Sequence, residues 1–121
     1  MKRLICGVLL AVVAASPAAA FQRGDWVLSQ WQGDENYYAG VVDRVDGKSV
    51  TVRYDDGDTD TRPANQVKKY NWRVGSRVEC NFQRGGTWYP GEISKLNNTK
   101  LSVAYDDGDR ETTNTGLCRS K

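Results

Sequence analysis

The residues best suited to chemistry lie in a short motif of one tyrosine and three aspartates, which the chain contains twice. The first copy is Tyr54-Asp55-Asp56-Gly57-Asp58, and the second, Tyr105-Asp106-Asp107-Gly108-Asp109, follows at an offset of 51 positions. Carboxylates grouped in this way can coordinate calcium, or the motif can simply form a hairpin turn. The calcium-loop pattern Asp-x-Asp-x-Asp-Gly fails here because Gly57 comes too early. We therefore expect acidic turns and no metal site.

Catalysis is not expected from the remaining residues. The chain has no histidine, and its sequence offers no nucleophile with a base beside it and no glycine-rich phosphate loop. Its paired carboxylates lie in turns and do not face each other across an evident cleft. The sequence thus predicts a protein that is not an enzyme and uses no cofactor.

The offset of 51 positions extends beyond the acidic motif, and it aligns the two halves of the chain without a gap. A repeat of this size is informative about fold, because each repeat is one structural unit. With two copies, each unit has to bury its own core, so we predict two small domains in tandem. The aligned pairs are Gly24 with Gly75, Val27 with Val78, Trp31 with Phe82, Tyr38 with Tyr89, Gly40 with Gly91, Val45 with Leu96, Val52 with Val103 and Thr61 with Thr112.

The first 20 residues resemble a secretory signal peptide. Lys2 and Arg3 precede an apolar stretch that is too short to span a bilayer, and a small-residue cleavage site ends at Ala20. We therefore expect a secreted or periplasmic protein whose mature chain has no membrane span. Without Lys2 and Arg3, the 17 basic and 15 acidic residues become 15 of each. A neutral chain lacks the positive field that drives non-specific binding to nucleic acid, so a nucleic-acid partner is not expected.

Two cysteines remain in the mature chain, Cys80 and Cys118, and both lie in the second repeat. An oxidising compartment allows them to pair, and their positions near the start and end of the repeat favour a disulfide over two free buried thiols. The bond would close a loop of about 40 residues and stabilise the domain by about 3–4 kcal/mol in the chain-entropy model. Two sulfurs without a histidine make a zinc site unfavourable.

The mature chain shows short alternating strands and no helical periodicity. In the first repeat we expect strands at residues 26–31, 37–45, 49–54 and 59–62 and a short closing strand near Val67, with a bulge or bend at Gly40. In the second we expect strands at residues 77–82, 88–96, 100–105 and 110–113, ending near Cys118, with residues 68–72 as the connection. Five short strands without exposed edges favour a small closed barrel.

This pattern resembles the Tudor family of the Tudor/Agenet royal superfamily. The features that carry the resemblance are Gly-x-x-Val, a strand ending in an aromatic residue, then Tyr-small-Gly, and finally aromatic-Asp-Asp-Gly. The resemblance implies an all-β fold of two five-stranded SH3-like barrels, at residues 21–70 and 73–121, after a signal peptide at residues 1–20.

In that family the ligand, a methylated lysine or arginine, lies in a cage of aromatic rings and an acid. The ring faces attract such a cation by roughly 0.5–2 kcal/mol each. Four further aromatic residues, Trp26, Tyr37, Trp72 and Trp88, are expected to pack or to lie between the domains. Carried over by motif, the first cage would contain Trp31, Tyr38, Tyr54 and Asp56, and the second Phe82, Tyr89, Tyr105 and Asp107.

The resemblance implies a non-catalytic module that binds a cationic, methylated or unmethylated side chain on a peptide or protein. On this hypothesis, replacing Tyr54 should abolish binding with little effect on folding. The alternative is an SH3-like structural or cell-envelope module, whose aromatic residues contact a glycan or a protein subunit.

Overall fold

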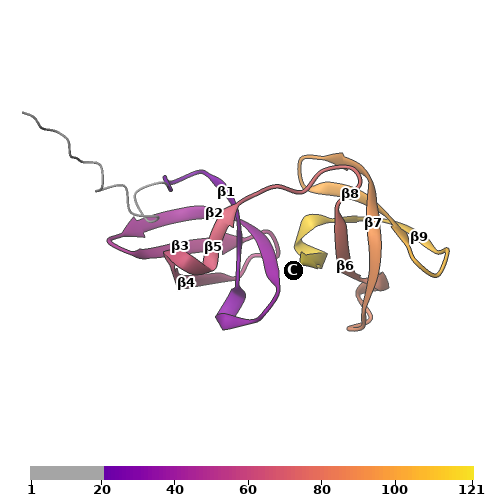
Figure 1. The fold of residues 1–121 in the computed structure, drawn as a ribbon, viewed down its shortest axis with the longest axis horizontal. Helices are drawn as coiled ribbons and strands as arrows, with labels where there is room; N and C mark the ends of the chain where they lie inside the picture. Colours follow the sequence, from indigo (N-terminus) through magenta and orange to yellow (C-terminus); the bar gives the residue numbers. More distant parts are fainter. Residues whose placement is uncertain (1–20) are drawn as a thin grey trace, which may run out of the picture.

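The computed structural model describes residues 21–121, so the predicted signal peptide lies outside the described residues. This part of the chain consists of β-strands joined by turns and by single turns of 3-10 helix, as the all-β prediction required. No helix in residues 21–121 is long and apolar enough to cross a membrane. Figure 1 shows two lobes, one for each repeat, which we call the first and second units.

The two units have the same strand order. In the first unit the strands pair in the order β4-β3-β2-β1-β5, and in the second in the order β9-β8-β7-β6-β10. The first unit contains β1 (Trp26–Ser29), β2 (Tyr37–Asp46), β3 (Ser49–Tyr54), β4 (Thr59–Pro63) and β5 (Val67–Lys69), with 3-10 turns η3 (Trp31–Gly33) and η4 (Ala64–Gln66). The second contains β6 (Arg77–Asn81), β7 (Trp88–Asn97), β8 (Lys100–Tyr105), β9 (Arg110–Asn114) and β10 (Cys118–Ser120), with η5 (Phe82–Arg84) and η6 (Thr115–Leu117).

Three details of the predicted strands were wrong. Strands β1 and β6 end at Ser29 and Asn81, so Trp31 and Phe82 lie in the following 3-10 turns and not in the strands. The bulge in β2 lies between Val42 and Arg44, not at Gly40. Gly40 has a different role, because any Cβ there would lie 2.7 Å from the carbonyl oxygen of Arg53 on the neighbouring strand. The connection also starts later than predicted, because Lys68 and Lys69 still belong to β5 and pair with β1.

Most of β1 and the adjoining part of β2 are buried on both faces. Val27 of β1 packs into the first unit's own core with Val42 and Val52. Its neighbour Leu28 points to the opposite face, since successive side chains of a strand alternate, and belongs with Ala39 of β2 to the core of the second unit. The second core is therefore built partly from the outer surface of the first unit.

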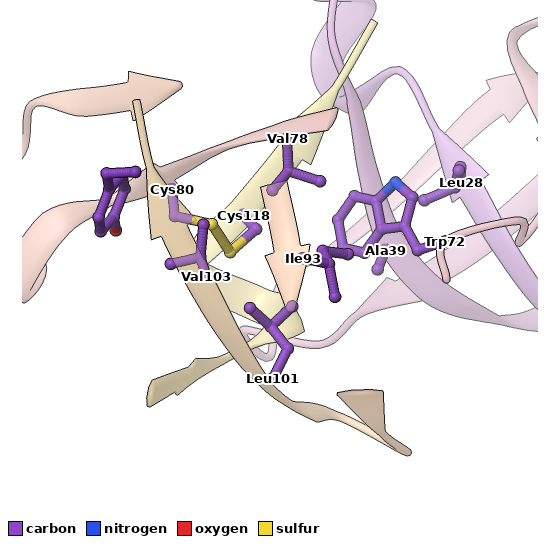
Figure 2. Packing of buried hydrophobic residues seen from close by; sticks show 10 residues of the cluster. Leu28, Ala39, Trp72, Val78, Cys80, Ile93, Leu101, Val103 and Cys118 are labelled. Carbon is purple, nitrogen blue, oxygen red and sulfur yellow. A yellow bond between two sulfur atoms is a disulfide. The ribbon is translucent and has the colours of Figure 1, made fainter. Parts of the chain in front are cut away.

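Trp72 of the connection completes this shared core. Its ring is 5% exposed and packs in the same cluster as Leu28, Ala39 and Ile93, as Figure 2 shows. Its indole Nε1–H donates a hydrogen bond of 3.0 Å to Ser120 Oγ of β10. Trp72 thus joins the units, in the manner predicted for it.

Strand β10 is shared between the units. It pairs with β6 through Cys118 and Arg119, and with β2 through Arg119 and Ser120, which lie opposite Tyr38 and Tyr37. The C-terminus accordingly lies between the two lobes (Figure 1). This pairing covers the outer edge of β10 and makes one continuous sheet of ten strands.

The disulfide joins the first and last strands of the second unit. Cys80 and Cys118 lie opposite each other in the β6–β10 register, and their sulfur atoms are bonded at 2.06 Å. Both residues are fully buried next to Val78 and Val103, as Figure 2 shows. The bond therefore fixes β10 to the second unit on one edge, while β2 holds its other edge.

Replacing Leu28 by alanine should destabilise the protein by about 3 kcal/mol, the cost of a cavity in a closed core. Because Leu28 belongs to β1 but packs in the second core, both units should lose stability together, in one urea transition. Val74→Ala is the control, because that side chain is 61% exposed and its truncation should change the free energy of unfolding very little. A loss at Leu28 no larger than that at Val74 would contradict the shared core.

Replacing both Cys80 and Cys118 by alanine should lower the free energy of unfolding by about 3–4 kcal/mol, through the larger entropy of the open chain. Urea unfolding followed by tryptophan fluorescence measures this loss. A reducing agent should destabilise the wild-type protein by a similar amount and leave the double variant unchanged. Equal stability of the oxidised and reduced wild type would refute the prediction.

Candidate functional site: an aromatic and acidic cavity between the units

The turn after β1 positions the first aromatic residue of each predicted cage. Trp31 and Phe82 begin η3 and η5, and the next residues, Gln32 and Gln83, have left-handed backbones with φ of 50° and 51°. A carboxylate fixes each turn: the backbone N–H of Gln32 donates to Asp60 Oδ2 at 2.7 Å. Glu111 does the same for Gln83 at 2.9 Å. Sequence reasoning missed these two acids, which lie at the same repeat offset.

The Asp-Asp-Gly turns position the aspartate of each predicted cage, Asp56 and Asp107. Asp56 Oδ1 accepts a hydrogen bond of 3.0 Å from the backbone N–H of Asp58, and Gly57 takes a φ of 101°, which side chains disfavour. Asp107 makes the equivalent bond of 2.9 Å to Asp109. Each Asp-Asp-Gly turn is thus closed by its second aspartate, which is the acid that the cage prediction used.

A cavity of about 440 Å³ lies between the two units. All four residues of the first predicted cage line it, namely Trp31, Tyr38, Tyr54 and Asp56. The structure therefore brings this set together. The cavity is also lined by residues that were not predicted for it, which are Asp34, Ala39, Asp58, Asn81, Trp88, Arg119 and the segment of η6.

Three partly exposed rings form the aromatic walls. The centroid of Tyr38 lies 6.0 Å from that of Trp31 and 6.1 Å from that of Trp88, with interplanar angles of 68° and 87°. Trp88 was expected to pack or to lie between the domains, outside a cage. It does lie between the units, but it is also a wall of the cavity. The first site is thus completed by the second unit.

Tyr54 forms part of the cavity but is mainly a core residue. Its side chain is 4% exposed, and its hydroxyl donates a hydrogen bond of 3.0 Å to the buried Ser29 Oγ. Burial raises the pKa of Tyr54 to about 12. The expectation that Tyr54 could be replaced with little effect on folding is therefore wrong, because its removal would leave a cavity and an unpaired hydroxyl.

Carboxylates make the cavity favourable for a cation. Asp34, Asp56 and Asp58 line it, against the single charge of Arg119. The Tyr38 hydroxyl donates a 2.6 Å hydrogen bond to Asp34 Oδ2. This bond holds the pKa of Asp34 below its usual value, while burial first, and then Asp34, raise the pKa of Tyr38. Near neutral pH the pair is therefore a phenol and a charged carboxylate.

Arg119 connects the aromatic and acidic parts of the cavity. Its guanidinium carbon lies 4.5 Å from the centroid of the Trp88 ring. Its Nε–H donates to Glu79 Oε1 at 2.9 Å, and its Nη1–H donates to the Tyr38 hydroxyl at 3.2 Å. The repeat offset could have revealed this pair, since it aligns Arg119 and Trp88 with Lys68 and Tyr37. Lys68 likewise lies 4.1 Å from the Tyr37 ring centroid.

The second predicted set is brought together only in part. The rings of Phe82, Tyr89 and Tyr105 are nearly perpendicular to one another, with centroids 5.6–6.4 Å apart. Tyr89 is 42% exposed, whereas Tyr105 is 5% exposed and donates a 2.6 Å hydrogen bond to Glu111 Oε1. None of these residues, nor Asp107, lines the cavity described above. At the position equivalent to Asp34 this unit has Gly85.

The acidic turns do not assemble into a metal-binding group. Residues 21–121 contain no cluster of three or more His, Cys, Asp or Glu side chains that could hold a metal ion.

The buried tyrosines predict a loss of stability in alkali. Burial raises the pKa of Tyr54 and Tyr70 to about 12 and also raises that of Tyr105, whereas unfolded tyrosine ionises near pH 10. The folded state therefore binds these protons more tightly. The contribution of these tyrosines to the free energy of unfolding is therefore fully present below about pH 10, and it is lost as the pH rises toward 12. Urea unfolding from pH 8 to 11.5 should show this decline.

Tyr70→Phe is the matched control for this titration. The Tyr70 hydroxyl is buried without a hydrogen-bond partner among the described residues, so the variant should be at least as stable at pH 8. It should also decline less steeply above pH 10. A flat stability profile up to pH 11.5 would refute the alkaline prediction.

A match to one protein family agrees with the sequence resemblance in the second unit. Residues 75–117, from the turn before β6 to the end of η6, match the Agenet domain family. No curated protein matches the chain. Among solved structures, the crystal structure of ADCP1 tandem Agenet domains 3–4 is 12% identical, with a TM-score of 0.42, and the match covers 87% of this chain and 86% of that one. The family match covers most of the second unit, which is therefore similar to an Agenet domain of the Tudor-like royal superfamily over residues 75–117.

Proposed function

We propose that this protein is a non-catalytic reader that binds a methylated lysine or arginine side chain of a peptide or protein in the cavity between its units. Agenet and Tudor-like domains are generally binding modules, and they often bind methylated histone peptides. The observation that carries the proposal is the lining of the cavity by three partly exposed rings, Trp31, Tyr38 and Trp88, together with three aspartates.

The chemistry of the lining suits a methylated cation. A methylated ammonium or guanidinium is weakly hydrated, so it loses little on leaving water, and each ring face attracts it by roughly 0.5–2 kcal/mol. The carboxylates of Asp34, Asp56 and Asp58 add charge complementarity. Because a flexible peptide has to be immobilised on binding, we expect a dissociation constant of about micromolar to millimolar.

We further propose that the protein acts outside the cytoplasm, in a periplasm or as a secreted protein. The pattern of residues 1–20 supports export. The buried Cys80–Cys118 bond is also in keeping with an oxidising compartment, where disulfides persist. The partner would then be an exported or extracellular protein that carries the modified side chain.

Titration of the oxidised protein with trimethyl-lysine, dimethyl-arginine and unmodified peptides, followed by heteronuclear NMR, tests this function. We expect saturable shifts at Trp31, Tyr38 and Trp88 that are larger for a methylated peptide. Trp31→Ala and Trp88→Ala should each weaken binding by about two- to thirtyfold, since each removes one ring face worth roughly 0.5–2 kcal/mol. A loss of affinity in Trp88→Ala would show that the ligand binds between the units, because Trp88 belongs to the second unit and the other rings belong to the first.

Trp26→Ala is the matched control. Trp26 is 46% exposed and packs edge to face on Tyr70, away from the cavity, so its removal should leave the affinity unchanged. Unchanged spectra at millimolar ligand would refute the proposed function. Binding that depends on Tyr89 but not on Trp31 or Trp88 would move the site to the second aromatic set.

A further inference from the structure

The cavity between the units has two walls of opposite character. Its carboxylates, Asp34, Asp56 and Asp58, all come from turns of the first unit. Its cation, Arg119, comes from β10 of the second unit, and Asn81 at the end of β6 lines the same cavity. The cavity therefore presents acceptors on one side and donors on the other.

Arg119 has hydrogen-bonding capacity that the protein does not use. A guanidinium carries five N–H donors. Among the described residues, one of them is taken by Glu79 and one by the Tyr38 hydroxyl. Three donors thus remain for water or a ligand.

The position of this guanidinium is fixed before a ligand arrives. It stacks on Trp88, and its backbone is held in β10 between β2 and β6, next to the disulfide at Cys118. An arginine held in this way loses little entropy when it binds an anion, and its planar fork suits a carboxylate.

We propose that Arg119 forms an anion subsite beside the aromatic rings, so that the preferred ligand is dipolar, with a methylated cation and a carboxylate close together. This inference rests on the proposed function and specifies its ligand. A volume of about 440 Å³ falls in the range of roughly 300–1,000 Å³ that is typical of sites for whole small molecules. The cavity thus has room for more than one methylammonium group.

Two sources could supply the carboxylate. It could be the C-terminal carboxylate of a peptide that ends in the methylated residue, or the side chain of an aspartate or glutamate next to that residue. Both would place an anion within a few bonds of the backbone that carries the cation. The two sources differ in where the methylated residue lies in the partner, so peptides can distinguish them.

Calorimetry of the oxidised full chain with two pairs of peptides tests the proposal. One pair ends in trimethyl-lysine, as the free acid and as the amide. The other has an internal trimethyl-lysine followed by glutamate or by glutamine. In at least one pair we expect the anionic peptide to bind about tenfold more tightly, the effect of one charge-assisted hydrogen-bonded contact.

Arg119→Gln should reduce this ratio of affinities to about one. Lys68→Gln is the matched control, because Lys68 is the repeat equivalent of Arg119, stacks on Tyr37 and does not line the cavity. The Lys68→Gln variant should keep the full preference for the anionic peptide. In the wild-type protein, NMR signals of the Arg119 guanidinium should shift with the anionic peptide and not with its neutral counterpart, which tests the contact without any substitution.

The possible failures are distinguishable. If the neutral and anionic peptides of both pairs bind equally well, the anion subsite is refuted and the methyl-cation site stands. If Arg119→Gln remains folded and keeps the preference, the assignment to Arg119 is wrong. If none of these four peptides, nor the same four with dimethyl-arginine in place of trimethyl-lysine, binds, the proposed function and the dipolar ligand are refuted together.

Discussion

The structure depends on the burial of both faces of β1 and the start of β2. Val27 belongs to the core of the first unit, while Leu28 and Ala39 face the other way and belong to the core of the second. A small domain buries a limited apolar area on its own, and here the second unit gains area by packing on the outside of the first. This shared core, with Trp72 within it, holds the two units together at the cavity.

The same packing makes two similar repeats functionally unequal. β5 and β10 are equivalent strands, but β10 also pairs with β2 of the other unit. The equivalent pairs Lys68–Tyr37 and Arg119–Trp88 both place a cation over a ring, yet Arg119 and Trp88 line the cavity and Lys68 and Tyr37 do not. Sequence differences between the two repeats add to this inequality, because Asp34 in the first unit corresponds to Gly85 in the second.

The cavity is also preorganised by its supporting contacts. Asp60 fixes the turn that carries Trp31, Asp56 closes its own turn, and Asp34 accepts the hydroxyl proton of Tyr38 in a hydrogen bond. Tyr54 lies below the rings as part of the core, bonded to Ser29. Groups held in this way lose little freedom when a ligand binds, which matters for a site whose individual ring contacts are weak.

The sequence by itself determined the repeat, the strands and the local turns, because alternation, Gly and Asp-Gly signals act over a few residues. The resemblance of the sequence to the Tudor family also implied that Trp31, Tyr38, Tyr54 and Asp56 form one set. Only the tertiary structure decided that Trp88 and Arg119 complete this set, because their contact with Tyr38 arises from the packing of two units and the pairing of β10 with β2. The alternation of β3 places Tyr54 on the same face as the core residues Val50 and Val52, but its hydrogen bond to Ser29 of β1 is a tertiary outcome.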